Sequence, residues 1–195
     1  MLIDLHCHTA PLSACSALDV GQLVELARSR GIDGICLTEH DRAWDNDELE
    51  ELQRSFEFPI FAGVELTTDM GHVLAFGLAP ASFSAVASEV FAAAQREGAL
   101  LFLAHPARDG MLRVTAETVR YFESVEAING SDSRLQNMAA TGLASGFRLP
   151  GIAGSDAHTG AEVGRAATRF GRPITTKEEL LGELSAGRYE AVSLA

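Results

Sequence analysis

The six histidines of this chain lie at or just beyond the edges of apolar segments that are expected to be strands. They are His6, His8, His40, His72, His105 and His158. In α/β proteins, functional side chains collect at the carboxyl ends of the strands. Neutral imidazole is a common ligand of zinc, iron, nickel and copper. The pattern therefore predicts one shared metal site rather than six unrelated histidines.

The segment Asp4-Leu5-His6-Cys7-His8 carries the clearest ligand spacing. Because a strand alternates its faces with a period of two, Asp4, His6 and His8 share one face of the expected first strand. Two imidazoles on one face can converge on one divalent ion. Asp4 lies one pleat deeper, where its carboxylate is expected to hold an imidazole N–H.

Two carboxylates follow other apolar segments. Glu65 comes directly after Ile-Phe-Ala-Gly-Val, and a buried glutamate needs a cation or a set of hydrogen-bond donors. Asp156 ends another strand and offers a carboxylate on the same face as His158. A helix cap or a surface position is the alternative for each acid.

The elements that must position these groups alternate along the chain. Strands are expected at residues 2–6, 34–38, 60–65, 72–76, 100–104, 124–128, 151–155 and 166–170, and helices at 19–30, 45–54, 84–97, 115–122, 134–144 and 177–186. Alternation of this kind implies an α/β fold with a parallel sheet and crossover helices. About seven β/α units in one domain, residues 1–195, favour a small closed barrel.

Charge and cysteine content narrow the function classes. The chain has 15 Lys+Arg against 27 Asp+Glu, a net charge of −12, which does not favour a nucleic-acid binder. A small phosphorylated substrate stays open, because bound divalent cations invert the local charge. The chain has three cysteines, no basic segment after Met1 and no long apolar run, a pattern that predicts a cytoplasmic protein without a membrane span. The sequence does not indicate an oligomeric state.

At this point the sequence resembles the PHP (polymerase and histidinol phosphatase) family of metal-dependent phosphoesterases. The matching segments are Asp4-Leu5-His6-Cys7-His8-Thr9, Thr38-Glu39-His40-Asp41, Gly63-Val64-Glu65, Gly71-His72-Val73-Leu74, Ala104-His105-Pro106 and Gly154-Ser155-Asp156-Ala157-His158. The resemblance implies a distorted seven-stranded (β/α)7 TIM-like barrel with up to three metals at the carboxyl ends of its strands.

The resemblance also implies a ligand set for each metal. The first metal would be held by His6, His8, Glu65 and Asp156; the second by Glu65, His72 and His105; and the third by His40 and His158. Zinc, manganese and iron are the candidate metals, in two to three copies. Glu65, Asp156 and His40 are the expected catalytic residues.

The chain departs from the family pattern around the third metal. Family members usually carry an aspartate or histidine where this chain has Ser13 and Ala14, and an aspartate where it has Glu39. The Cys15 thiolate is chemically able to complete a zinc site, and a small buried loop residue is its alternative role. The sequence therefore predicts a third metal that binds more weakly than the other two.

Three residues are expected to contact the substrate. Arg108 follows His105-Pro106, where similar small phosphoesterases often have an arginine, and a guanidinium can grip a phosphate with two hydrogen bonds. Asn129 lies in the segment that resembles the penultimate strand of the family. Arg134 is the third candidate, with a solvated surface position as the alternative.

Together these residues predict hydrolysis of a phosphate ester, a small phosphomonoester or a nucleotide, by a metal-activated hydroxide at a di- or trinuclear site. Two alternatives stay open. One is a metal-dependent amidohydrolase or deaminase, although the chain has a single lysine, Lys177, whereas those barrels usually carry a bridging lysine. The other is a non-catalytic, metal-stabilised PHP module that supports a partner protein.

Overall fold

The computed structural model describes residues 1–108 and 114–195. The strands in this part are β1 (Leu2–Cys7), β2 (Gly34–Leu37), β3 (Ile60–Ala62), β4 (Val64–Thr68), β5 (Gly71–Phe76), β6 (Leu100–Leu103), β7 (Ser124–Asn129), β8 (Ile152–Gly154), β9 (Ala166–Phe170) and β10 (Tyr189–Ser193). The helices are α1 (Val20–Ser29), α2 (Asn46–Phe56), α3 (Ala87–Glu97), α4 (Arg134–Phe147) and α5 (Lys177–Ser185), with short 3-10 turns at Pro80–Ser82 and Val119–Tyr121.

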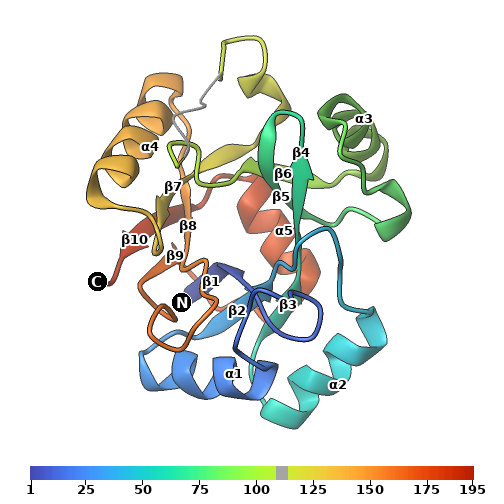
Figure 1. Cartoon of the computed structure of the whole chain (residues 1–195), viewed down its shortest axis with the longest axis vertical. Helices are drawn as coiled ribbons and strands as arrows, with labels where there is room; N and C mark the ends of the chain where they lie inside the picture. Colours follow the sequence, from blue (N-terminus) through green and yellow to red (C-terminus); the bar gives the residue numbers. More distant parts are fainter. Residues whose placement is uncertain (109–113) are drawn as a thin grey trace.

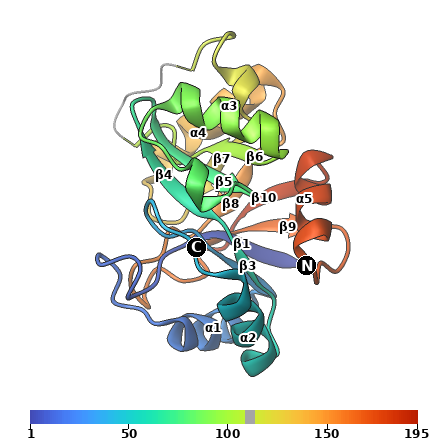
Figure 2. The same ribbon diagram turned by 90° about the vertical axis from the view of Figure 1, so that its right-hand side faces the viewer.

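The strands form two five-stranded sheets that face each other. The first sheet has the order β10-β9-β1-β2-β3 and the second the order β4-β5-β6-β7-β8. Figures 1 and 2 show α1 and α2 covering the first sheet, α3 and α4 on the opposite side of the molecule against the second, and α5 at one end. The α/β class predicted from the sequence is confirmed.

Both sheets are mixed, so the expected parallel sheet is wrong. Parallel pairs join β1 to β2, β2 to β3, β6 to β7 and β7 to β8. In contrast, β9 runs antiparallel to β1 and β10, and β5 runs antiparallel to β4 and β6. The short turn between β4 and β5 can join only antiparallel neighbours, whereas β9 pairs with strands that are distant in the sequence.

The two sheets touch at their ends without forming a continuous ladder. Isolated bridges join Cys7 to Ala157 and His40 to Glu65. In the part of the chain that the structure describes, no unbroken hydrogen-bonded ring of strands closes a barrel. The bridges nevertheless bring the ends of β1, β2, β4 and β8 together, and these are the segments that carry the predicted ligands.

Three further expectations need correction. The strand expected at 60–65 is split at Gly63, where a Cβ atom would clash with Phe76 and Thr38, and the chain passes there from the first sheet to the second. The helix expected at 115–122 is only a 3-10 turn, because the Thr115 and Thr118 side chains bond to local backbone N–H groups instead. The edge strand β10 was not expected at all.

The interior between the sheets is packed with apolar side chains. Leu5, Phe76, Phe102 and Ile152 are fully buried in one cluster. Leu180 and Leu184 of α5 belong to the same cluster, so α5 seals one end of the interior. Burial of such side chains contributes about 1.5–3 kcal/mol each. The polar centre therefore has to lie at the other, open end.

A glycine sets the distance between β8 and β1. A Cβ atom on Gly154 would collide with the Cβ and backbone nitrogen of His6. Only the missing side chain lets the two strands approach so closely. This contact brings the Asp156 and His158 segment beside His6 and His8. Among the described residues, no helix is both long and apolar enough to cross a membrane.

Candidate metal centre

The six histidines and two acids predicted from the sequence converge at the open end of the interior. They form three groups that could each hold a metal ion, and within each group the ligand atoms lie within 4.8 Å of one another. The groups are His6, His8, Glu65 and Asp156; Glu65, His72 and His105; and His8, His40 and His158. We call these the first, second and third groups.

Four donor atoms of the first group face one small space. The Nε2 atoms of His6 and His8 lie 3.0 Å apart. Glu65 Oε2 lies 3.3 Å from His6 Nε2 and 3.2 Å from His8 Nε2. Asp156 Oδ1 lies 3.5 Å and 3.2 Å from the same two nitrogens. All four residues are buried, so two ring nitrogens and two carboxylate oxygens meet away from the protein surface.

Glu65 links the groups through its two oxygens. Its Oε1 accepts hydrogen bonds of 2.8 Å from His72 Nδ1 and His105 Nε2, the members of the second group. Its Oε2 faces the first group and also lies 3.0 Å from His40 Nδ1. None of these contacts of Oε2 has hydrogen-bond geometry, so Oε2 is buried without a hydrogen-bond partner. A buried carboxylate oxygen without a donor is costly. A divalent cation fits this donor set and would satisfy that oxygen.

The charges of the centre depend on one another. Burial by itself would raise the pKa of Glu65, but the charge of His6, the hydrogen bond from His105 and the nearby His40 ring hold it well below its usual range. Burial would lower the pKa of His6, but Asp156, Glu126 and Glu65 raise it well above its usual value. Metal binding therefore competes with protons for the imidazole nitrogens, and it releases protons.

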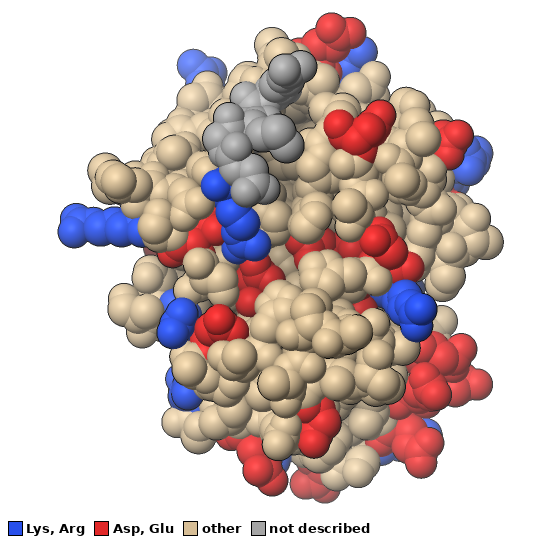
Figure 3. All heavy atoms as spheres, in the orientation of Figure 1, with Lys and Arg blue, Asp and Glu red and all other residues tan. Residues whose placement is uncertain are grey.

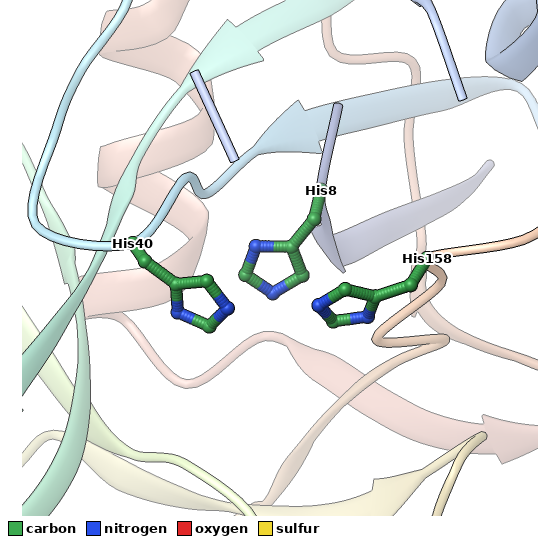
Figure 4. A group of neighbouring side chains, drawn as sticks. All are labelled: His8, His40 and His158. Atoms are coloured by element: carbon green, nitrogen blue, oxygen red, sulfur yellow. The ribbon is translucent and has the colours of Figure 1, made fainter. Parts of the chain in front are cut away.

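The third group lies around the ring of His8. In Figure 4 the rings of His40 and His158 flank that of His8, and their centroids lie 4.3 Å and 4.4 Å from it. The sequence assigned only His40 and His158 to the third metal, and the structure places His8 in the same group. Cys15 is exposed and belongs to none of the three groups of described residues.

The departure at Glu39 has a structural explanation. Glu39 is fully buried and accepts hydrogen bonds from the backbone and side chain of Thr9, from the Ser13 hydroxyl and from Trp44 Nε1. The carboxylate thus holds the loop that follows β1. Ser13 Oγ, on the same loop, lies 3.4 Å from His8 Nδ1. A serine bound to a glutamate stands here in place of a direct ligand.

The centre has a buried floor and a partly exposed rim. His6, His8, Glu65 and Asp156 form the floor. At the rim, the exposed fractions are 32% for His40, 35% for His72, 26% for His158 and 31% for Arg108. The side of the centre that reaches the surface is therefore the one that carries these four side chains.

The expected substrate residues have different environments. Arg108 donates to Asp132 Oδ1 at 2.7 Å, to Asn129 Oδ1 at 3.0 Å and to Asp156 Oδ2 at 2.7 Å. The amide of Asn129 is buried and bonded to Arg108, Glu126 and Asp156, which makes it an internal support. Arg134 is exposed at the start of α4 and lines a cavity of about 810 Å³ whose lining contains none of the eight ligands.

The residue that holds an imidazole N–H is Glu126 and not Asp4. Asp4 Oδ1 accepts from the backbone nitrogens of His6 and Ser155. Glu126 Oε1, in contrast, lies 3.0 Å from His6 Nδ1. The sequence could have indicated Glu126, because a glutamate inside the apolar strand 124–128 needs a polar partner. Which partner it finds depends on the neighbouring strand.

Comparisons with known families agree with this geometry. The model of the PHP domain matches residues 4–138, which is more than half of the chain. The chain belongs to the PHP family. A second model, described as PHP-associated, matches residues 134–189. Membership of the PHP family, together with the histidine and acid groups, supports a metal-dependent hydrolase.

Solved structures share the PHP fold with this chain. A two-domain protein from Bacteroides vulgatus, which contains a predicted PHP-like metal-dependent phosphoesterase, is 21% identical with a TM-score of 0.75; the match covers 99% of this chain and 64% of the other. A protein from Bifidobacterium adolescentis, provisionally named a metal-dependent phosphoesterase, is 18% identical with a TM-score of 0.67, and the match covers 95% and 96%.

An amidohydrolase from Chromobacterium violaceum, solved with bound sulfate and no metal, is 20% identical with a TM-score of 0.68; the match covers 99% of this chain and 98% of the other. At these identities the likeness shows the fold. The chain spans 64% of the length of the Bacteroides vulgatus protein. No curated protein sequence matches this PHP chain significantly.

The arrangement of the third group leads to a prediction. His40→Ala should abolish metal binding at the third group, because only His8 and His158 would remain there. Cys15→Ser should have a small effect, since Cys15 lies outside the group. Metal titration of both variants, with and without inorganic phosphate, measures this. Three equally tight sites in the wild type, with one lost in Cys15→Ser, would make Cys15 a ligand.

Proposed function

We propose that this PHP protein hydrolyses phosphate esters of small molecules at a centre of two or three divalent metals. The observation that supports this most directly is the position of Glu65, whose two oxygens belong to adjacent ligand groups. When bound, divalent metals there would activate water and neutralise the charge of a phosphoryl group. Zinc, manganese and iron suit this mixed set of nitrogen and oxygen donors.

Different residues around the centre would hold different metals. His6, His8, Glu65 and Asp156 would hold one metal, and Glu65, His72 and His105 another. His40 and His158 would hold the third, beside the His8 ring, and face the phosphate at the rim. The burial of the floor keeps bulk water away from the reacting phosphorus.

Arg108 is the proposed phosphate-binding residue. Its Nε and Nη2 atoms are used by Asp132, Asn129 and Asp156, and none of the hydrogen bonds of residues 1–108 and 114–195 uses Nη1. Burial would lower the pKa of this guanidinium, but Asp156 and Asp132 raise it, so it stays charged. A fixed positive charge at the rim, with a donor that no described residue uses, suits a phosphate oxygen. Arg134 is proposed only as an outer contact for a larger substrate.

The charge of the surface favours a small substrate. On the face shown in Figure 3, basic side chains are scattered, and acidic ones lie across its middle and around its edge, with a group at the lower right. A polynucleotide would need a continuous basic surface. A small phosphomonoester or a nucleotide needs only the metals and Arg108.

A second candidate is a metal-dependent amidohydrolase, because one structure with this fold carries that name. The bridging lysine of such barrels has no counterpart in the three ligand groups, which consist of histidines and acids. The sole lysine, Lys177, begins α5 at the opposite end of the interior. We therefore rank the amidohydrolase second.

The test is metal removal and replacement. Protein stripped with a chelator should hydrolyse no chromogenic phosphomonoester, and reconstitution with zinc, manganese or iron should restore turnover with at least two bound equivalents. A panel of phosphorylated metabolites would then identify the substrate, and ammonia release from amides would identify the amidohydrolase instead. Fewer than one equivalent of metal after reconstitution would contradict the proposal.

We also propose that residues 1–195 act as one domain in the form of a distorted barrel, located in the cytoplasm. Hydrogen bonds from Phe170 N to the Met1 carbonyl and from Leu194 N to the Arg165 carbonyl support one unit, since they tie both ends of the chain to β9 and to the residue before it. All three cysteines are free thiols, as a reducing compartment requires.

A further inference from the structure

Among the described residues, Glu126 of β7 is an acid whose side chain contacts His6 of the first group and His105 of the second without belonging to either group. Its side chain is fully buried. Oε1 lies 3.0 Å from His6 Nδ1, a ligand residue of the first group. Oε2 accepts from the backbone nitrogen of His105, in the second group, at 2.8 Å, and from Asn129 Nδ2 at 2.9 Å.

We propose that Glu126 is a positioning residue that sets the ring of His6 and the backbone of His105 at the same time. This inference rests on the proposed metal centre and is independent of the reaction that the centre catalyses. In this role Glu126 binds neither the metal nor the substrate directly.

The proton arrangement follows from the partners. The backbone N–H of His105 and the amide of Asn129 can only donate, so both bonds to Oε2 require an acceptor. In its carboxylate form Glu126 accepts at Oε1 as well, and this places the proton of the neutral His6 ring on Nδ1. The Nε2 lone pair is then directed at His8 Nε2, 3.0 Å away, and at the carboxylates of the first group. Fixing the tautomer in this way favours metal binding at Nε2.

The backbone of His105 needs a partner for a different reason. Its φ angle is +26°, in the left-handed region that a residue with a side chain adopts only when its surroundings hold it there. The hydrogen bond from its N–H to Glu126 Oε2 supplies such a constraint. With the backbone turned this way, His105 Nε2 reaches Glu65 Oε1 at 2.8 Å.

A β-bulge explains how Glu126 and Asn129 can cooperate. In a regular strand, residues three apart point to opposite faces. The pairing of β7 with β8 shifts register between Glu126 and Ile128, so Ile152 and Ala153 oppose positions that are two apart. The extra residue turns Asn129 onto the face of Glu126, where it also supports Asp156 Oδ2 at 3.3 Å.

The decisive variant is Glu126→Gln. A glutamine of the same shape presents one oxygen and one NH2 group, so it cannot accept from both His6 Nδ1–H and the donors at Oε2. We expect the affinity for zinc to fall about 10- to 100-fold at both the first and second groups, as for other residues that hydrogen-bond to metal ligands. Competition with a chromophoric chelator measures both affinities.

The matched control is Glu183→Gln. Glu183 is also mostly buried and pairs with Arg172 and Arg188, remote from the ligand groups. It should leave zinc affinity unchanged even if it lowers the melting temperature. Unchanged zinc affinity in a folded Glu126→Gln protein, or an equal loss in both variants, would overturn the inference.

A spectroscopic test needs no variant. In zinc-loaded wild-type protein with labelled histidines, His6 should show a protonated Nδ1 and a downfield proton resonance from its bond to the carboxylate. A His6 ring with its proton on Nε2, or with zinc on Nδ1, would overturn the inference. A wild-type protein that takes up no zinc would instead contradict the metal centre of the proposed function.

Discussion

Replacing Glu65 by glutamine should remove bound metal and lower the turnover of a phosphate ester by more than the roughly 100-fold seen for residues that only support ligands. The reason is that Glu65 Oε1 contacts His72 and His105, whereas Oε2 faces His6, His8 and His40. Glutamine keeps the shape of the side chain but loses the charge. Its NH2 group also presents hydrogen atoms where metals require lone pairs.

Metal analysis after reconstitution, together with single-turnover assays, measures the effect of this change. A suitable control is Glu39→Gln, because Glu39 is also fully buried near the centre but belongs to none of the ligand groups. That control should loosen the loop after β1 and leave the first and second metals bound. If Glu65→Gln kept both metals and near wild-type turnover, Glu65 would not be the shared ligand.

Asp156→Asn should have the second largest effect, and a more selective one. Asp156 Oδ1 faces the Nε2 atoms of His6 and His8, whereas Oδ2 accepts from Arg108 Nη2. The second group contains Glu65, His72 and His105 but not Asp156. We therefore expect the loss of one metal equivalent and a fall in turnover of about 100-fold or more, with the second metal still bound.

Asp132→Asn is the matched control for this variant. It removes another carboxylate partner of Arg108, at 2.7 Å from Nε, without changing a ligand group. Metal content should then stay at the wild-type level, and only KM for the phosphate ester should rise. An equal loss of both metals in Asp156→Asn, or a loss of metal in Asp132→Asn, would contradict the separation between the two groups.

Much of the centre follows from the sequence because its signals are local. Two signals were enough to predict a metal site at strand ends: the spacing of His6 and His8 on a period-two strand, and Glu65 after the apolar run that ends at Val64. Helix α1 begins after Asp19, which forms a capping box with Gln22, as the residue types indicate. Burial and periodicity act over a few residues, and sequence reasoning is strongest at that range.

The direction of the strands was decided only by the tertiary structure. An apolar segment such as 166–170 pairs equally well in either direction when read alone. In the folded chain it lies antiparallel between β1 and β10, because β10 returns beside it from α5. Strand direction depends on contacts between segments far apart in the sequence, which no local pattern encodes.

The sequence by itself determined which residue types would meet, namely six histidines with Glu65 and Asp156, and at which ends of the strands. Only the tertiary structure decided which of these residues form each ligand group and which side chains support them. It gave His8 a place in two groups, and it put Glu126 instead of Asp4 behind His6. The physical reason is that hydrogen-bond partners and ligand sets depend on strand register, on a bulge in β7 and on the close approach at Gly154.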